Sequence, residues 1–192
     1  LMFKDVNTYY DAWELGSMYE NLPVPLEERA TVTMQPGTYR AALEISRKIG
    51  DSALRQEIVL TADSPYIEFV TQIDWQERHK LLKVAFPVNA YAKEAIHEIQ
   101  FGYVKRPTHR SYQTDKDRFE VCNHRYTALA DNAHGCAVVN DCKYGVGVEQ
   151  NSIELTLLRA AASPEMGTDQ GEQTFRYGFT AWNTSFADAP IV

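Results

Sequence analysis

Short runs in which apolar and polar residues alternate fill most of this chain, and they constrain its fold more than any other feature. In one run Ile153, Leu155 and Leu157 alternate with Glu154 and Thr156, and similar runs recur along the 192 residues. Alternation with a period of two is typical of a β-strand with one buried face. Residues that favour turns separate the runs. About ten short strands of this kind predict an all-β fold, a sandwich or a barrel.

Little of the chain has a helical pattern. Residues 9–19 are one candidate for a short helix, because apolar side chains lie there among polar ones. Residues 88–93 and 125–130 are expected to form turns or single-turn helices. No linker, internal repeat or low-complexity run divides the sequence. We therefore expect residues 1–192 to form a single domain.

The charge balance argues against two classes of partner. The formal net charge is −7. Nucleic acids and anionic membrane surfaces attract basic proteins, so neither is an expected partner. No apolar run approaches the roughly 20 residues of a membrane span, and no basic-then-apolar leader opens the chain. The composition fits a protein that handles neutral ligands.

The cysteines indicate a reducing compartment. Cys122, Cys136 and Cys142 are odd in number and irregular in spacing, which favours reduced thiols and a cytoplasmic chain. A structural zinc site is the sharper alternative, since Cys122 with His124 and His134 with Cys136 form two pairs whose members share a strand face. The spacing is not that of a zinc finger, and buried structural thiols are the commoner case, so we expect no metal in this chain.

The densest polar stretch of the chain is a turn between two apolar strands. It contains Asn140, Asp141, Lys143 and Tyr144 and ends at Gly145. Amides, carboxylates, amines and aromatic rings are the groups that bind sugars, so these four residues are candidate substrate contacts. The structural alternative is that Asp141 caps the turn, Lys143 pairs with a neighbouring acid and Gly145 supplies a positive φ.

Three further features have a functional and a structural interpretation. Arg106 and His109 flank Pro107 in a second polar loop, where Arg106 could present its guanidinium to a carboxylate outside the chain or could simply be solvated. Asp141 with Glu172 or Asp169 is the first pair of carboxyl groups to test for a catalytic role, although all three also suit turns. Trp75 is a sugar platform or, more commonly, a core anchor.

Seven blocks of sequence together resemble the C-terminal β domain of the family 38 glycoside hydrolases, the α-mannosidases, and most resemble the cytoplasmic and bacterial branch. They are YDAWEL (residues 10–15), DWQER with LKVAFPV (74–78 and 82–88), FGYVKRPTH (101–109), FEVCNHR (119–125), NDCKYG (140–145), LLR (157–159) and DQGE (169–172). Their order and approximate spacing match the family.

The resemblance implies a galactose-mutarotase-like supersandwich, which is an antiparallel β-sandwich. An incomplete sandwich, with some of its strands outside this chain, fits the resemblance as well. It also implies that an α/β barrel absent here carries the zinc and the nucleophile, with a helical bundle between barrel and β domain. On this interpretation the chain holds no catalytic residue and binds no cofactor. Its partners are those domains of the same polypeptide and a mannose-containing oligosaccharide, and Asn140, Asp141, Lys143, Tyr144, Arg106 and His109 are rim or interdomain candidates.

Two hypotheses follow. The first is a non-catalytic C-terminal β domain of an enzyme that hydrolyses terminal α-mannosides, which supports the barrel and lends residues to the active-site rim. The alternative is a stand-alone carbohydrate-binding β-sandwich. The ends of the chain, Leu1-Met2 and Ile191-Val192, do not look natural, so a piece of a longer protein is expected. An incomplete sandwich exposes edge strands, which makes a homo-oligomer a further expectation.

Overall fold

The computed structural model describes residues 1–6, 9–165 and 167–191. In this part of the chain, strands dominate and helices are short, which confirms the all-β prediction. The strands are β1 (Met2–Lys4), β2 (Thr31–Gln35), β3 (Arg40–Ile49), β4 (Ser52–Thr61), β5 (Ile67–Trp75), β6 (Lys80–Pro87), β7 (Glu94–Ile99), β8 (Gly102–Pro107), β9 (Val121–Cys122), β10 (Tyr126–Ala130), β11 (Gly135–Asn140), β12 (Gly145–Glu149), β13 (Ser152–Arg159) and β14 (Gly171–Trp182). The helices are the 3₁₀ turns η1 (Tyr19–Asn21) and η2 (Phe186–Asp188) and the single α-helical turn α1 (Gln113–Lys116).

Two of the expected helical pieces are wrong. Residues 11–13 and 17–18 form turns, residues 14–16 have no regular structure, and a 3₁₀ helix begins only at Tyr19. Residues 126–130 form strand β10, which pairs with β11 on one side and β7 on the other. Its three central residues are all buried, so the period-two pattern that marks a half-exposed strand is missing there. The sequence pattern also missed α1.

Contacts divide the chain into two compact units. Unit 1 comprises Leu1–Ala62, Phe69–Val84 and Thr156–Phe175, and unit 2 comprises Asp63–Glu68, Ala85–Leu155 and Arg176–Val192. Strands β5, β6, β13 and β14 contribute residues to both units. The single-domain expectation therefore stays a prediction.

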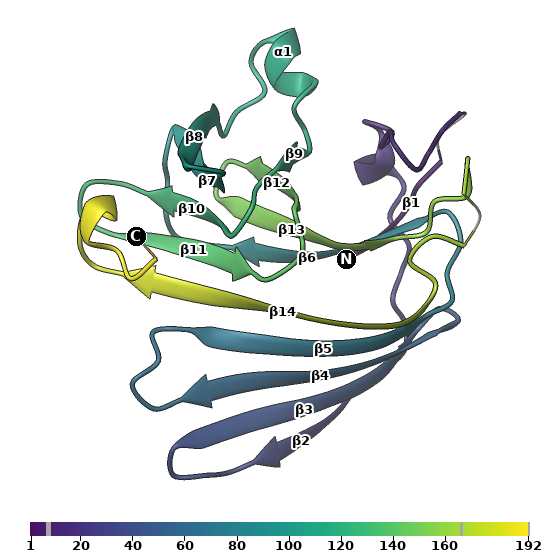
Figure 1. The fold of residues 1–192 in the computed structure, drawn as a ribbon, viewed down its shortest axis with the longest axis horizontal. Helices are drawn as coiled ribbons and strands as arrows, with labels where there is room; N and C mark the ends of the chain where they lie inside the picture. Colours follow the sequence, from purple (N-terminus) through teal and green to yellow (C-terminus); the bar gives the residue numbers. More distant parts are fainter. Residues whose placement is uncertain (7–8, 166, 192) are drawn as a thin grey trace. The chain divides into compact units, whose positions relative to one another are not determined.

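Unit 1 combines strands of two sheets. β1, β6 and β13 are neighbours in one sheet, and β2, β3, β4, β5 and β14 are neighbours in the other, with β2 at its edge (Figure 1). β3 and β4 form a long antiparallel hairpin from Ile49↔Ser52 to Arg40↔Thr61. Trp75 of β5 is fully buried and donates its ring N–H to the carbonyl of Arg159 in β13 at 3.3 Å. This contact joins the two sheets and confirms Trp75 as a core anchor.

Unit 2 has the same arrangement, built from the remaining strands and from parts of the strands that both units share. β13, β12 and β9 are neighbours in the first sheet, and β14, β11, β10, β7 and β8 in the second. The ring of Phe86 in β6 stacks on Phe179 in β14, with centroids 5.4 Å apart and planes 8° apart. A buried cluster on the second sheet includes Ile96, Ala128 and Trp182. Each unit thus packs strands of both sheets against each other, as predicted for an antiparallel sandwich.

Among the residues that the structure describes, no helix has the length and apolar character needed to cross a bilayer. Cys122, Cys136 and Cys142 are unpaired thiols, of which only Cys136 is buried.

Candidate functional site

The predicted polar turn is closed by the side chain of Asn140, the last residue of β11. Its Oδ1 accepts the backbone N–H of Lys143 at 2.8 Å, and its Nδ2 donates to Oδ1 of Asn123 at 2.9 Å. Both ends of the amide are therefore used within the protein. The prediction that Asp141 caps the turn is wrong, because the residue before it does so. Gly145 does not adopt a positive φ either, since the turn is complete before β12 begins.

Asn123 is the residue that holds this turn in place, and the sequence pattern did not identify it as a site residue. Its side chain is 1% exposed. Its backbone N–H and its Nδ2 both donate to the carbonyl of Tyr144, at 2.9 and 3.3 Å. Together with the bond from Asn140, this amide connects both ends of the turn. The only available signal was its place in the FEVCNHR block.

The other turn residues lie around this amide pair. Asp141 is exposed, and one carboxylate oxygen accepts the backbone N–H of Arg176 in β14 at 3.2 Å. Lys143 is half-buried. Tyr144 is 47% exposed, and its ring centroid lies 5.7 Å from that of His124. Asp141 and Tyr144 thus present side chains to solvent on a fixed backbone.

Two adjoining hollows in unit 2 meet at the turn. Their volumes are about 590 and 370 Å³, and Tyr66, Val139, Asn140 and Asp141 line both of them. The larger hollow is also lined by Glu98, His124, Arg125, Tyr126 and Ile191, and the smaller one by Glu68, Arg176, Tyr177 and Gly178. The structure therefore places two of the predicted residues, Asn140 and Asp141, on a concave surface with aromatic rings and charged groups. A further hollow of about 360 Å³ over strands β3–β5 contains none of the predicted residues.

The ionisable groups around these hollows have structural partners. Glu98 accepts the backbone N–H of Arg125 at 2.8 Å and lies 3.5 Å from Nδ1 of His124. Burial, followed by the charge of Glu98, raises the pKa of Tyr126. Burial and then the hydrogen bond to Asp141 raise the pKa of the Cys142 thiol. None of these shifts creates an activated nucleophile.

Arg106 and His109 do not line these hollows. Arg106 and Pro107 end strand β8 and do not form a loop, and proline is accepted there because β8 is the edge of its sheet. Arg106 donates to the carbonyl of Cys122 at 3.3 Å, and burial lowers its pKa. His109 lies near α1, with Nδ1 3.8 Å from the carboxylate of Asp115. The two residues that the sequence grouped therefore have separate surroundings.

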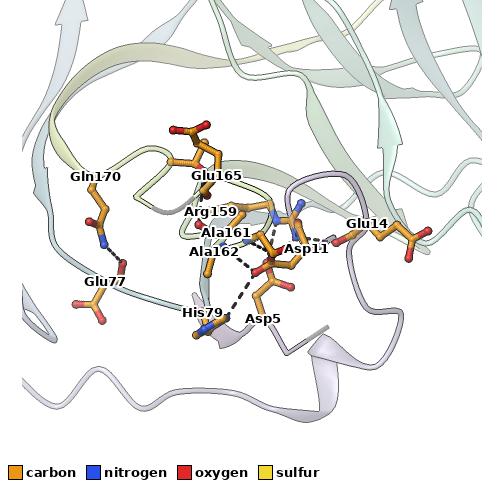
Figure 2. A network of polar contacts seen from close by, with 12 residues as sticks. Asp5, Asp11, Glu14, Glu77, His79, Arg159, Ala161, Ala162, Glu165 and Gln170 are labelled. Atoms are coloured by element: carbon orange, nitrogen blue, oxygen red, sulfur yellow. Dashed lines mark hydrogen bonds and ion pairs between the residues drawn. The ribbon is translucent and has the colours of Figure 1, made fainter. Parts of the chain in front are cut away.

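Unit 1 contains a polar network that the sequence reasoning missed, shown in Figure 2. Arg159, the last residue of β13, donates Nε and Nη2 to one oxygen of Asp5, at 2.8 and 2.7 Å. The same Nη2 donates to the carbonyls of Asp11 and Glu14, at 2.6 and 2.8 Å. Arg159 thus ties the N-terminal segment to β13 in two places.

Asp11 provides the second half of this network. Its two oxygens accept the backbone N–H groups of Ala162 and Ser163, at 2.9 and 2.6 Å, and Nδ1 of His79 lies 3.6 Å away (Figure 2). Burial alone would raise the pKa of Asp11, but these two donors, with smaller contributions from His79 and Arg159, lower it overall.

A neighbouring bond adds Glu77 and Gln170. Glu77 is 2% exposed and binds Lys80 at 2.7 Å, the N–H of Asp51 at 2.7 Å and the hydroxyl of Ser52 at 3.1 Å. The side-chain amide of Gln170 donates to the backbone carbonyl of Glu77 at 3.1 Å. Asp11, Glu77, Arg159 and Gln170 come from four of the seven sequence blocks, so those blocks meet in one unit.

Nothing in these surroundings makes the predicted acid pair catalytic. Asp141 belongs to unit 2, whereas Asp169 and Glu172 belong to unit 1, so the pair stays a prediction. Asp169 accepts the backbone N–H of Arg159 at 3.4 Å, which is a structural contact.

The described residues contain no group of three or more His, Cys, Asp or Glu side chains arranged to hold a metal ion. His124 lies beside Glu98, and His134 lies 3.1 Å from Asp131, so both histidines of the zinc alternative have carboxylate partners. The described part of the chain therefore does not bring these residues together as the structural zinc site of the sequence alternative.

Comparison with known proteins agrees with the sequence blocks. The model of the glycosyl hydrolases family 38 C-terminal domain matches residues 1–166. Alpha-mannosidase 2C1 of Homo sapiens is 37% identical over an alignment that covers 100% of this chain and 19% of that protein. Alpha-mannosidase G of Dictyostelium discoideum is 33% identical and is matched over 18% of its length. The chain thus spans about a fifth of the length of these relatives.

A solved structure shows the same fold. The crystal structure of an alpha-mannosidase from Enterococcus faecalis V583 superposes with a TM-score of 0.73, covering 82% of this chain and 22% of that one. The identity is 17%, so this likeness supports the fold only. The assignment rests on the family model and on the similarity of this whole chain to parts of two alpha-mannosidases. The chain belongs to the C-terminal domain family of the family 38 glycosyl hydrolases.

Proposed function

We propose that this chain is the non-catalytic C-terminal β domain, a single domain, of a larger enzyme that hydrolyses terminal α-mannosides. It supports a catalytic barrel and a helical domain of the same polypeptide and contributes residues to the rim of the active site. Relatives that carry the name alpha-mannosidase are about five times as long as this chain, which supports a multidomain parent. The retaining reaction and the zinc that assists it belong to segments outside these residues.

The observation that carries the rim assignment is the pair of hollows at the polar turn. Asn123 and Asn140 fix the turn backbone, so the groups at its surface are held in place before a ligand arrives. Tyr66, Tyr126 and His124 provide rings, and Asp141, Arg125 and Arg176 provide hydrogen-bonding groups. This combination suits a mannose-containing oligosaccharide. Lys143 and Tyr144 are the turn residues that would reach beyond the hollows toward the barrel.

Arg106 and His109 have a weaker claim to the rim. Arg106 already binds a backbone carbonyl, and His109 already lies near a carboxylate. We propose them as interdomain contacts and not as sugar ligands.

The parent protein is proposed to be cytoplasmic. Three free thiols, two of them exposed, suit a reducing compartment. Fractionation of the parent's native host tests this directly, and recovery of the activity outside the cytoplasm would contradict it.

The experiment uses the parent protein and an aryl α-mannoside. We expect Lys143→Ala to lower kcat/KM by roughly tenfold, which corresponds to about 1.4 kcal/mol of lost transition-state stabilisation. Lys48→Ala on strand β3 is the matched control and should change nothing. Equal and negligible effects would remove Lys143 from the rim.

The isolated 192-residue chain tests the rest of the proposal. It should not hydrolyse the mannoside with or without added zinc, and zinc-dependent turnover would refute a non-catalytic domain. Calorimetric titration of the isolated chain with mannose oligosaccharides distinguishes the proposed enzyme domain from the alternative, a stand-alone binding module. Saturable binding by the chain alone would favour that module, because the proposed rim needs the barrel to complete the site.

A further inference from the structure

The loop formed by residues 9–18 exposes an unusual number of large side chains. Tyr9, Tyr10, Trp13 and Met18 are 76%, 55%, 71% and 65% exposed. The rings of Tyr10 and Trp13 contact each other, with centroids 5.4 Å apart. Single exposed apolar residues are ordinary, but four within ten positions form a local concentration that usually marks an interaction surface.

The backbone of this loop is held firmly, although its side chains are not covered. Nη2 of Arg159 binds the carbonyls of Asp11 and Glu14, which flank Trp13 (Figure 2). The N–H of Trp13 donates to the carbonyl of Tyr10 at 2.9 Å, and Tyr10 itself has a positive φ of 52°. A bulky residue in that conformation is uncommon and persists where its surroundings impose it.

The network that imposes this conformation is costly. Asp5 is fully buried, and its Oδ1 has no hydrogen-bond partner. A buried ion pair of this kind seldom adds much net stability, because desolvation offsets the attraction, but it does fix geometry. The geometry that Arg159 fixes is the backbone of the aromatic loop. The network therefore fixes the loop whose exposed side chains could contact a partner.

We propose that Tyr9, Tyr10, Trp13 and Met18 form a preformed docking surface for another part of the same polypeptide, outside residues 1–192. This inference rests on the proposed function, in which the chain is one domain of a longer enzyme. The relatives extend far beyond the region they share with this chain, which supports the presence of such a segment. The occupant is a folded, apolar protein surface in permanent contact.

The composition of the loop favours this occupant over a sugar or a second copy. Tyr, Trp and Met are enriched in the cores of protein interfaces, and the four exposed side chains carry no charge. A sugar site needs polar groups that converge on a concavity, whereas the hollows described above are lined by other residues. Rigid presentation also lowers the ordering cost of docking within one chain.

Hydroxyl-radical footprinting with mass spectrometry tests the surface residue by residue. The parent protein and the isolated chain are oxidised in parallel, and the modification rates of Tyr10, Trp13 and Met18 are compared. We expect the rates to fall by roughly tenfold or more in the parent, because residues in an interface core lose contact with solvent. Tyr39 of unit 1 and Tyr91 of unit 2 are 79% and 71% exposed and serve as matched references. Their rates should change much less.

Each other outcome overturns the inference. Equal rates in both proteins mean that the loop docks nothing. Protection that grows with the concentration of the isolated chain identifies a second copy as the occupant, and protection of the isolated chain by mannose oligosaccharides identifies a sugar platform. The footprint does not depend on hydrolysis. An inactive parent with a protected Trp13 would refute the proposed function and leave the docking surface intact, and an active parent with an unprotected Trp13 would do the reverse.

Arg159→Lys in the parent tests the positioning role of the network. Lysine keeps the positive charge but cannot make the forked contacts to Asp5 and the two carbonyls. Tyr10 and Trp13 should regain part of their oxidation rate while Tyr91 does not change. A footprint identical to that of the unmodified parent would show that Arg159 does not position the loop. Unfolding curves followed by intrinsic tryptophan fluorescence check that the variant is folded.

Discussion

Single buried amides, more than exposed charges, determine the geometry of the candidate rim. Asn123 contributes no side chain to either hollow, yet it holds Tyr144 and Asn140 through three hydrogen bonds. A buried amide that loses its partners leaves those partners unsatisfied as well. The rim should therefore be more sensitive to a change at Asn123 than to one at exposed Asp141.

Asn123→Ala should destabilise the chain by about 1–3 kcal/mol, because it leaves buried polar groups without partners. Urea unfolding followed by tryptophan fluorescence gives the free energy of unfolding. Asn132→Ala, at an exposed asparagine, is the control and should remain within about 0.5 kcal/mol of the unmodified chain. Coincident curves for the two variants would show that Asn123 does not hold the turn.

His97 gives the chain a pH dependence in a defined window. It is 1% exposed, Nδ1 lies 3.1 Å from the hydroxyl of Thr127, and burial, with Arg106 second, lowers its pKa to about 4. The unfolded chain, with a histidine pKa near 6.5, then binds a proton that the folded chain does not. Stability should be greatest above pH 6.5 and should fall toward pH 4, by at most about 1.4 kcal/mol per pH unit.

Urea midpoints between pH 5 and 7 measure this slope. His97→Gln should flatten it, whereas His109→Gln, at a half-exposed histidine, should retain it. The lowered pKa values of Asp11 and Glu77 also remove stability as the pH falls, starting at the usual carboxyl pKa of about 4 and continuing down to their lowered values. An unchanged slope in His97→Gln would show that folding does not lower the pKa of this histidine.

At the scale of elements, the outer strands of unit 1 leave an apolar face uncovered. Antiparallel pairing places Met34 opposite Leu43 and Leu43 opposite Ile58, so the three side chains share one face. Met34 is 68% and Leu43 40% exposed. β2 is an edge strand of five exposed residues without charge or proline, which is the kind of edge that pairs with other chains.

We expect the isolated chain to self-associate through this face as its concentration rises. Met34→Lys should keep it monomeric at higher concentration, because a charge on the apolar face disfavours burial. Thr33→Lys places the same charge on the opposite face of β2 and is the matched control. Light scattering coupled to size exclusion measures the mass, and an equal effect of both substitutions would contradict a specific role for this face.

Alternation in the sequence identified most strands but could not identify what covers them. The pattern groups Ala41, Leu43 and Ile45 on one face, and the register agrees, yet that face is partly open. β10 escaped detection because its three central residues are all buried, so it lacks the alternation of exposed and buried residues. The local sequence pattern identifies which residues are apolar, whereas their exposure in the fold depends on segments that are distant in the sequence.

The candidate site shows the same division. The pattern located the turn, but it assigned the cap to Asp141, because Asn140 and Asp141 are equally good capping residues and only the position of Asn123 separates them. The Arg159 network could not be predicted, since its members lie as far apart as Asp5 and Arg159. The sequence blocks that carry the family resemblance contain Asp11 and Arg159, but nothing in those blocks indicated that the two residues share a network.

At the scale of the whole molecule, the question is whether two compact units behave as one domain. Strands β5, β6, β13 and β14 each contribute residues to both units, so the backbone of each runs through both. An opening that breaks one of these strands in unit 1 also strains its continuation in unit 2. Because of these four continuous strands, we expect the units to open together.

Hydrogen exchange of the isolated chain under low concentrations of denaturant measures this coupling. The slowest amides of β3 and β4 in unit 1 and of β10 and β11 in unit 2 should reach the same opening free energy, with the same dependence on denaturant, because a shared global opening exposes the same surface. Amides of the exposed edge strand β2 should exchange earlier and serve as an internal reference for local opening. If the amides of one unit exchange through a lower-energy opening than those of the other, the units are separate folding domains and the single-domain prediction is wrong.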